Sequence, residues 1–270
     1  MRIAGTGGYW QFRPRGHRLG SFCRSVKAHG PWLSIHRWPR CSRCGRLALR
    51  DPRRGRLTPS PAPASLRGTV VFDLGGVLID WDPRHLYRKL FPGDAAGMER
   101  FLAEVCTGAW NLQQDAGRPW AEATAALKAE YPAQAALIDA FHRRWPEMIA
   151  GPIAGTVEIL ADLKAAGTPL YALTNWSAET YPVALERFPF MEWFRGIVVS
   201  GQEKLIKPDP RIYRLLVERH GLRPEDIVYI DDNVRNAAAA TALGMHGIHF
   251  TGPPALRQEL VSLGLLRHSG

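Results

Sequence analysis

The sequence predicts an α/β protein in which a parallel β-sheet is covered by helices on both faces. From residue 68 onward, short apolar strands alternate with helical segments, and this alternation is typical of a parallel sheet. One interval, residues 83–150, has amphipathic helical patterns but no strand signal. We interpret that interval as a helical cap inserted after the first strand, over the carboxyl end of the sheet, where it can act as a lid.

The predicted strands are short and rich in β-branched or aromatic residues. They lie near residues 69–74, 169–174, 196–200, 226–231 and 246–250. Helical patterns occupy 157–166, 210–220 and 236–243, and the second of these begins with Asp209 as a predicted N-cap and Pro210 at its first position. The predicted inward-facing residues are Ile159, Leu160 and Leu163 in the first helix, and Ile212, Leu215 and Leu216 in the second. In the cap, amphipathic stretches lie around 84–91, 97–107, 118–130 and 133–149.

These patterns divide the chain into a tail, a core, a cap and a C-terminal segment. We predict a basic, disordered extension and linker at 1–67, a Rossmann-like α/β core at 68–82 and 151–255, the cap at 83–150, and a helix or tail at 256–270.

The positive charge of the chain belongs to residues 1–67. This segment has 15 Lys and Arg residues and one acid, Asp51, whereas the rest of the chain has 20 basic and 24 acidic residues. It is rich in Arg, Gly, Pro and Ser without periodicity, so we expect it to be disordered. Contacts to nucleic acid, organelle targeting, and translation from an upstream start codon are three interpretations. We favour an extension without a function of its own.

The cysteines indicate neither a disulfide framework nor a strong metal motif. Cys41 and Cys44 have the spacing of half a zinc site, with His29 and His36 nearby, but a second such pair is missing from the sequence. Cys106 lies in a helical pattern and is predicted to be a small core residue. We expect no secretory signal, no membrane-spanning segment and a cytoplasmic location.

Polar side chains follow several predicted strands at the points where they end. Asp73 comes directly after the first strand and precedes a Gly-Gly turn. The other residues of this kind are Thr174 and Asn175 after the second strand, Lys207 before the helix at 210–220, and Asp231 with Asp232 at the end of the fourth strand. Each motif alone has a structural explanation as a turn, a cap or a solvated charge. Because the carboxyl ends of parallel strands meet at one edge, we expect these groups to converge.

The converging groups have the chemistry of a phosphate site. Carboxylates held close together repel one another unless a cation lies between them, and Mg²⁺ prefers such oxygen ligands. Thr174 and Lys207 would add a hydrogen bond and a positive charge. The set fits a reaction in which Asp73 attacks a phosphate whose charge is offset by a metal ion and an ammonium group.

With these motifs in this order and a helical insertion after the first, residues 68–255 resemble the haloacid dehalogenase superfamily of hydrolases. The resemblance implies a Rossmann-like sheet with a mobile cap, and a phosphatase that forms an aspartyl-phosphate on Asp73 and acts on a small phosphorylated metabolite. The catalytic or phosphate-binding residues that it implies are Asp73, Thr174, Asn175, Lys207 and Gly76. The implied cofactor is Mg²⁺, with ligands from Asp73, the main-chain carbonyl of Gly75, Asp231 and Asp232.

Gly75 departs from the family pattern, because typical phosphatases of the family carry a second Asp there as general acid and base. Positioned acid–base help is worth about 10²–10⁴-fold. One interpretation is a phosphatase that obtains its proton from Asp80, Asp82 or a cap residue such as Asp115. The other is a metal-independent 2-haloacid dehalogenase, since halide leaves without a proton.

The fourth motif favours the phosphatase. Dehalogenases of the family tend to have Ser in place of the acids, whereas this chain keeps Asp231 and Asp232. A third hypothesis is a weakly catalytic protein that binds a phosphorylated ligand. Asn236 is a second departure from the family, where many members have Asp, and we expect it to tune the metal site or to hold Lys207.

The cap segment 109–115 combines Trp110 with amide and acid groups. It can line a polar substrate pocket, but we favour a turn between helices with Trp110 packed in the cap core. Trp176, after the second strand, either faces the pocket or supports the cap.

Overall fold

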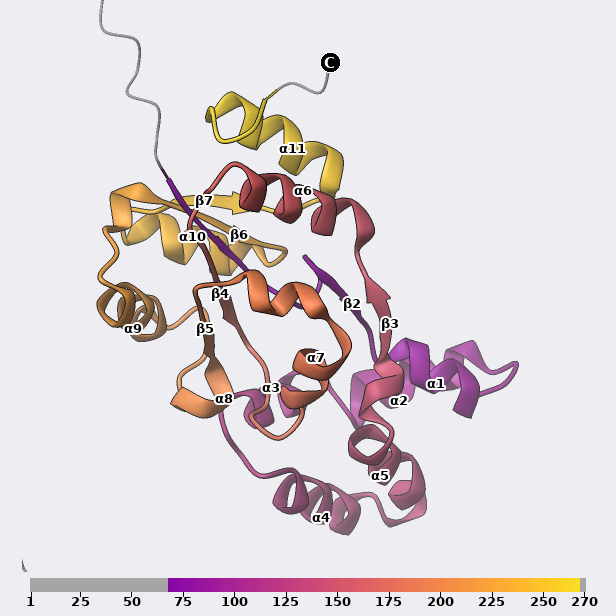
Figure 1. The fold of residues 1–270 in the computed structure, drawn as a ribbon. Helices are drawn as coiled ribbons and strands as arrows, with labels where there is room; N and C mark the ends of the chain where they lie inside the picture. The colour runs from indigo at the N-terminus through magenta and orange to yellow at the C-terminus, as the bar shows by residue number, and fades with distance from the viewer. Residues whose placement is uncertain (1–67, 268–270) are drawn as a thin grey trace, which may run out of the picture. The chain divides into compact units, whose positions relative to one another are not determined.

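The computed structural model describes residues 68–267 (Figure 1). The predicted extension at 1–67 lies outside the described residues, together with Cys41, Cys44 and the zinc, targeting and nucleic-acid interpretations attached to it.

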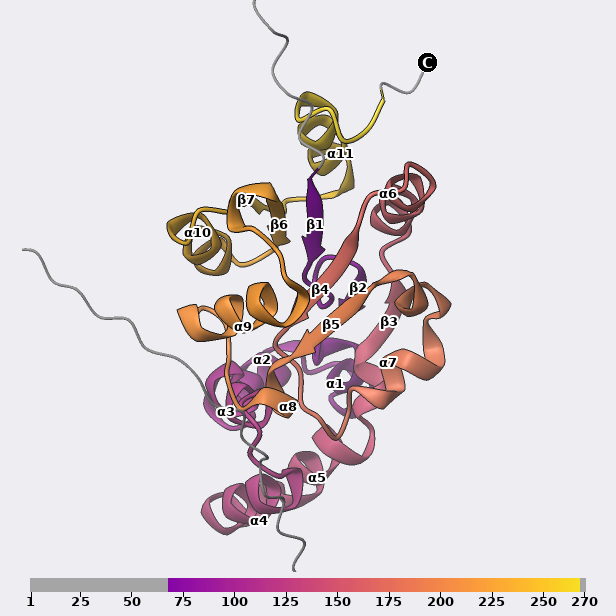
Figure 2. The same ribbon diagram turned by 60° about the vertical axis from the view of Figure 1, so that its left-hand side comes forward.

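Within residues 68–267, five strands form a parallel sheet in the order β5-β4-β1-β6-β7 (Figures 1 and 2). Their bounds are Thr69–Phe72 for β1, Leu170–Thr174 for β4, Gly196–Val199 for β5, Ile227–Asp231 for β6 and His246–His249 for β7. The predicted α/β class and the positions of these strands are confirmed. Short buried strands are recognisable from local composition because both of their faces are apolar.

The central strand of this sheet is β1, which pairs with β4 on one side and β6 on the other. The chain builds β4 and β5 on one side of β1 and then crosses to build β6 and β7 on the other. The order of the strands therefore reverses at β1, and ligands of such sheets bind at the carboxyl ends of the strands beside that point.

The two faces of the sheet have separate apolar layers, because successive side chains of a strand point to opposite sides. Val70 and Phe72 belong to one buried cluster with residues of α6 and α11, and Val71 belongs to the other with residues of α9 and α10 (Figure 2). These helices span Ala154–Ala165 (α6), Pro253–Ser262 (α11), Pro210–His220 (α9) and Val234–Ala242 (α10).

The predicted core helices are present, with ends that differ by at most three residues, and Leu215 is only partly buried, whereas Ile212 and Leu216 of the same helix are fully buried. The predicted core residues Ile159, Leu160 and Leu163 are at most 1% exposed. Asp209 caps α9, with its carboxylate accepting a hydrogen bond from the Arg211 main-chain N–H at 2.9 Å. The shorter helices of the core are α7 at Pro182–Arg187 and α8 at Ser200–Glu203.

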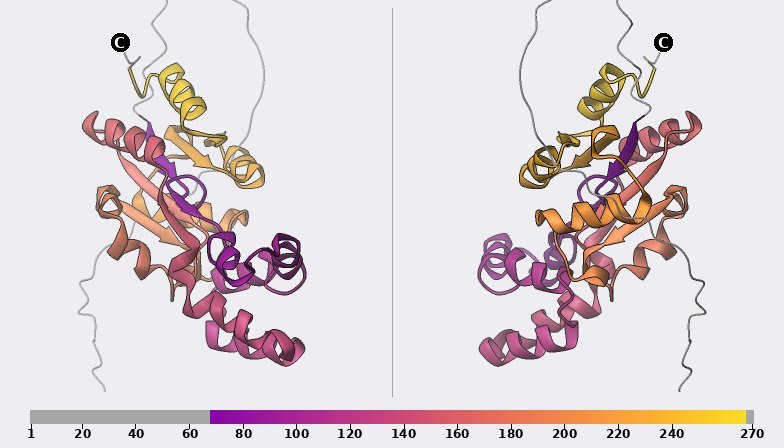
Figure 3. Two further views of the ribbon diagram at one scale, coloured as in Figure 1. Left: turned by 90° about the vertical axis from the view of Figure 1, so that its right-hand side faces the viewer. Right: turned by 90° about the vertical axis from the view of Figure 1, so that its left-hand side faces the viewer.

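Helices α1 to α5 form the cap and gather at one end of the sheet (Figure 3). They span Arg84–Leu90, Ala95–Glu104, Gly108–Asp115, Trp120–Glu130 and Ala135–Arg143. The amphipathic stretch predicted at 133–149 contains α5 and then a 3₁₀ turn at Trp145–Met148. The α-helix ends there because Pro146 lacks an N–H and disfavours the helical conformation of the residue before it.

Two corrections concern the cap. Strand β3 at Ile149–Pro152 begins inside the interval predicted to lack strands, and it pairs antiparallel with β2 at Ile79–Trp81. Strands this short have no recognisable sequence pattern and are identified only from their pairing in the structure. The pairing joins the segment that enters the cap to the segment that leaves it. Residues 109–115 are not a turn but belong to α3, which begins after the N-cap Thr107. Trp110 packs in the cap core as predicted, edge-to-face against Trp120 and Phe141.

Trp120, at the start of α4, connects the cap to the core. Its ring stacks on His142 of the cap with centroids 5.0 Å apart. Its indole N–H donates to Ser177 Oγ at 3.0 Å, and its main-chain N–H donates to Glu179 at 2.9 Å. Since Ser177 and Glu179 follow β4, these bonds hold the cap near the carboxyl end of the sheet.

In the part of the chain that the structure describes, there is no helix with the length and apolar character needed to cross a membrane.

The burial of α6 predicts a contrast between two leucines. We expect Leu160→Ala in the full chain to lower the free energy of unfolding by about 2–5 kcal/mol, because Leu160 is fully buried and its removal leaves a cavity. The matched control Leu185→Ala, at a side chain that is 50% exposed, should change it by about 0.5 kcal/mol or less. Urea denaturation followed by circular dichroism measures both, and equal losses would contradict the packing described.

Candidate active site

Asp73 lies at the carboxyl end of β1 and is 7% exposed. Its main-chain N–H donates to Ile230 at 2.8 Å and continues the pairing with β6. Carboxylate oxygen Oδ1 accepts a hydrogen bond from the Leu74 N–H at 2.7 Å, while Oδ2 pairs with Lys207. The strand and the turn that follows it thus hold this carboxylate at the switch point of the sheet.

The Lys207 ammonium group is buried among oxygen atoms from three strands. Its Nζ lies 2.7 Å from Asp73 Oδ2, 2.8 Å from Asp231 Oδ2 and 3.0 Å from the Leu173 carbonyl oxygen. An ammonium group has three hydrogen atoms to donate, and these partners use all of them. Burial alone would lower the pKa of Lys207, but the two carboxylates outweigh it and raise the pKa. Lys207 is therefore a fixed positive charge beside Asp73.

Asp231 is fully buried, and both of its oxygens already accept two hydrogen bonds. Oδ2 accepts from Lys207 at 2.8 Å and from the Tyr229 hydroxyl at 2.7 Å. Oδ1 accepts from the Asn233 main-chain N–H at 2.9 Å and from Asn236 Nδ2 at 3.0 Å. This arrangement makes Asp231 the group that positions Lys207, and Asn236 supports Lys207 through it. Metal binding by Asp231 stays a prediction, since an ion would have to displace one of these bonds.

Asp232 is exposed and lies against the turn that follows β1. A Cβ atom placed on Gly76 would collide with the Asp232 carboxylate, and Gly76 has a φ of +73°, so this position requires glycine for two reasons. The Gly76 N–H donates to the Ile79 carbonyl at 2.9 Å, so it serves the turn. A phosphate contact from Gly76 stays a prediction.

Three carboxylates of this edge form an acidic cluster. One oxygen from each of Asp73, Asp231 and Asp232 lies within 4.8 Å of the others. Burial raises the pKa of Asp73 to about 7; Lys207 opposes the rise, and the other two acids add to it. Burial and the charge of Asp231 also raise the pKa of Asp232. A cation placed here would relieve the repulsion among these groups.

The donors fit Mg²⁺, which takes oxygen ligands. Because the Asp231 oxygens are saturated, the residues best placed to hold the ion are Asp73, Asp232 and the Gly75 carbonyl. This fit rests on the close approach of the Asp232 carboxylate to the Gly75–Gly76 turn.

Thr174 is the last residue of strand β4, next to β1, and Asn175 follows it. Thr174 is 1% exposed. The Asn175 side chain donates from Nδ2 to the Lys207 carbonyl at 3.0 Å and accepts the Lys207 main-chain N–H at 2.8 Å. Asn175 therefore clamps the loop that carries Lys207 to β4. Contact of Asn175 with the substrate stays a prediction.

A small cavity of about 60 Å³ lies between the core and the cap at this edge. It is lined by Gly75, Trp81, Asn111, Asp115, Trp145, Asn175 and Trp176. Trp176 lines this cavity and also packs on Trp145 of the cap, with ring centroids 5.3 Å apart. Trp176 therefore both faces the cavity and supports the cap.

Of the three acids considered as proton donors, the structure brings Asp115 into this cavity. Asp80 instead pairs with His85 at 3.0 Å, and Asp82 pairs with Arg84. Neither Asp80 nor Asp82 lines the cavity beside Gly75.

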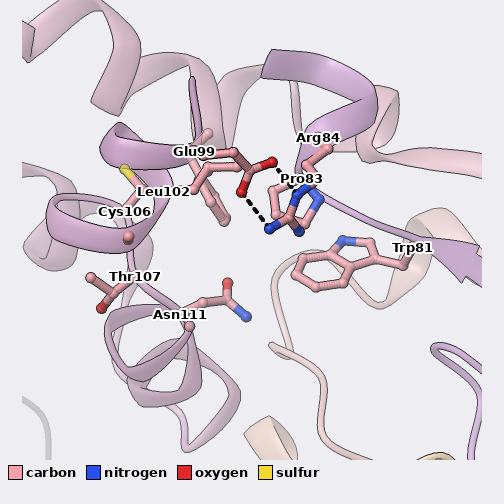
Figure 4. A pocket seen from close by; sticks show the side chains of 11 residues that line it. Trp81, Pro83, Arg84, Glu99, Leu102, Cys106, Thr107 and Asn111 are labelled. Atoms are coloured by element: carbon pink, nitrogen blue, oxygen red, sulfur yellow. Dashed lines mark hydrogen bonds and ion pairs between the residues drawn. The ribbon is translucent and has the colours of Figure 1, made fainter. Parts of the chain in front are cut away.

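A second cavity, of about 230 Å³, lies within the cap between α1, α2 and α3 (Figure 4). Arg84 and Glu99 form a two-bond ion pair on its wall, at 2.7 Å each (Figure 4). Trp81 and Asn111 line both cavities. Within residues 68–267, the Trp81 indole nitrogen and Asn111 Oδ1 are buried without a hydrogen-bond partner, so they are available to a bound molecule.

Cys106, on the wall of the second cavity, is 3% exposed, which confirms it as a core residue. Burial raises the pKa of its thiol to about 12, although a hydrogen bond with Tyr87 opposes the rise.

Sequence reasoning missed the residues that support the site. Tyr229 had a usable signal, because it lies two residues before Asp231 in β6 and so points to the same face. Asn233 is the N-cap of α10, and its position between a strand and a helix is typical of a cap. Ser177 and Ser200, which bond to the cap, had no signal in the sequence.

The comparisons with known proteins agree with this geometry. The family model described as haloacid dehalogenase-like hydrolase matches residues 68–244. Sesquiterpene phosphatase astK of Aspergillus oryzae is 26% identical over 202 residues, which cover 72% of this chain and 95% of that protein. Phosphoglycolate phosphatase of Photobacterium profundum is 29% identical over 188 residues, with 67% and 82% covered.

Other similar proteins include dehalogenases. (S)-2-haloacid dehalogenase 1 of a Pseudomonas species is 31% identical over 112 residues, which cover 42% of this chain and 47% of that protein. Among solved structures, a HAD family enzyme from Bacteroides thetaiotaomicron is 25% identical with a TM-score of 0.51, and the match covers 66% of this chain and 90% of that one. With its family model, parallel sheet and acidic cluster in agreement, the chain belongs to the haloacid dehalogenase-like hydrolases.

Proposed function

We propose that this hydrolase is a Mg²⁺-dependent phosphatase that acts on a small phosphorylated metabolite through an aspartyl-phosphate on Asp73. The observation that carries the proposal is the cluster of Asp73, Lys207 and Asp232 at the switch point of the sheet. A buried anion, a fixed cation and a second carboxylate together suit a dianionic phosphate bound through a metal ion.

Each residue of the cluster has a separate task in this reaction. Asp73 attacks phosphorus with its carboxylate oxygen. Lys207 favours the ionised form of Asp73 against the effect of burial and offsets the negative charge on the phosphate oxygens, and Thr174 donates a hydrogen bond that orients the phosphate. Bound Mg²⁺, held by Asp73, Asp232 and the Gly75 carbonyl, would supply further positive charge at those oxygens.

Two phosphatases among the similar proteins support this proposal, and the similar haloacid dehalogenase supports the alternative. Gly75 is compatible with both, because it provides no acid in either reaction. The acidic cluster separates them: displacement of a halide needs no cation, so Asp232 beside Asp73 would raise the electrostatic cost without a benefit. For that reason we rank the phosphatase first and the weakly catalytic ligand-binding protein last.

The first test replaces the nucleophile. With the full chain and a panel of phosphomonoesters, we expect Mg²⁺-dependent phosphate release that a chelator abolishes and that Asp73→Asn lowers by at least about 10³-fold. Thermal unfolding of Asp73→Asn should stay close to that of the parent, because Lys207 keeps Asp231 as a partner. Chloride release from 2-chloropropionate that is unaffected by chelator would instead establish the dehalogenase.

A second test separates the metal site from general acidity. We expect Asp232→Asn to raise the Mg²⁺ concentration for half-maximal phosphate release by about tenfold or more, since it removes a ligand. The matched control Asp162→Asn lies on α6, pairs with Arg257 and should leave that concentration unchanged. An equal effect of the two substitutions, measured by titrating MgCl₂ at saturating substrate, would exclude Asp232 from the metal site.

A further inference from the structure

The cap holds a carboxyl group at the place where the core lacks one. We propose that Asp115 of α3 is the general acid, and then the general base, of the proposed phosphatase reaction. This inference rests on the proposed function and adds the residue that moves the proton.

Asp115 and Gly75 line the same small cavity, one from the cap and the other from the turn after the nucleophile. A Cβ atom built on Gly75 would meet no heavy atom within 4 Å, so the turn faces open space. A leaving group bound to a phosphate at Asp73 would occupy that space and would lie between Gly75 and Asp115.

The Asp115 carboxylate is oriented by a side chain of its own helix. Asn111, one turn earlier in α3, donates from Nδ2 to Asp115 Oδ2 at 3.1 Å. The Asp115 carbonyl accepts a hydrogen bond from Ser200 Oγ at 2.6 Å, and Ser200 Oγ accepts the Trp176 N–H at 2.9 Å. The end of α3 is therefore anchored to the loops that follow β4 and β5.

The surroundings of Asp115 suit proton transfer at neutral pH. Burial raises the pKa of Asp115 to about 7, although the Ser177 N–H and the charge of Lys207 oppose the rise. A group with such a pKa is populated in both of its protonation states near neutrality, which is the condition for acting first as acid and then as base.

The proposed reaction has two steps. A carboxylate oxygen of Asp73 attacks phosphorus, the bond from phosphorus to the leaving oxygen breaks, and that oxygen takes the proton of Asp115. Asp115, now ionised, accepts a proton from water as the water oxygen attacks phosphorus. The bond from phosphorus to Asp73 breaks, which restores the Asp73 carboxylate, the protonated Asp115 and free phosphate.

The test uses two leaving groups of similar shape, 4-nitrophenol, which needs no proton to leave, and phenol, which does. For Asp115→Asn in the full chain with Mg²⁺, we expect kcat/KM for phenyl phosphate to fall by about 10²–10⁴-fold and that for 4-nitrophenyl phosphate to fall by less than about tenfold. The amide keeps an oxygen that can accept from Asn111, and thermal unfolding checks the fold. The matched controls Asp80→Asn and Asp82→Asn should lower neither value.

The pH profile gives a second readout. Because the first step needs protonated Asp115, kcat/KM for phenyl phosphate should fall as pH rises through about 7. This decline should be absent in Asp115→Asn, and it should be absent with 4-nitrophenyl phosphate, which controls for titration of the other groups of the site.

Equal losses on both substrates in Asp115→Asn, or no loss on either, would overturn the role of Asp115. A selective loss in Asp80→Asn or Asp82→Asn would assign the role elsewhere. Asp73→Asn should abolish turnover of both substrates whatever Asp115 does, so that variant tests the proposed function separately. If the parent protein released phosphate from neither substrate, the proposed function would fail and this inference with it.

Discussion

The site depends on one buried ammonium group. Lys207 Nζ lies within 3.0 Å of oxygen atoms from Asp73, Asp231 and Leu173. One ammonium group thus contacts the carboxyl ends of three neighbouring strands. Without it, two buried carboxylates would face each other without compensation, which is far more costly than leaving the pair intact. Two sets of hydrogen bonds hold this ammonium group in place. Asn175 binds the main chain of Lys207, and Asp231, which pairs with Lys207, accepts four hydrogen bonds in all.

The two glycines of the turn after β1 have different effects on the site. Gly76 has the positive φ that the turn needs and leaves room for the Asp232 carboxylate, so it brings a second acid beside Asp73. Gly75 could offer its carbonyl to a metal ion, but it has no side chain for proton transfer. In the proposed reaction, the core would therefore keep its metal ligands, while a residue in another part of the molecule would have to supply the proton.

That other part is the cap, which is tied to the core at the same edge of the sheet. Trp120 donates to Ser177 and Glu179, and Ser200 donates to the carbonyl of Asp115. These bonds hold a cap carboxyl, Asp115, on the wall of the cavity that Gly75 also lines. Trp81 of β2 and Asn111 of the cap line both this cavity and the larger one inside the cap.

Local patterns in the sequence were enough to predict the strands of the parallel sheet, the helices that cover it, and the convergence of Asp73, Lys207 and Asp231, because parallel strands end at one edge. The pairing of β2 with β3, the saturation of Asp231 and the place of Asp115 depend on partners far away in the chain. Ser200 and Asp115 are 85 residues apart, and no local pattern carries a contact of that separation. Only the packing of the cap on the sheet decided which acid faces Gly75.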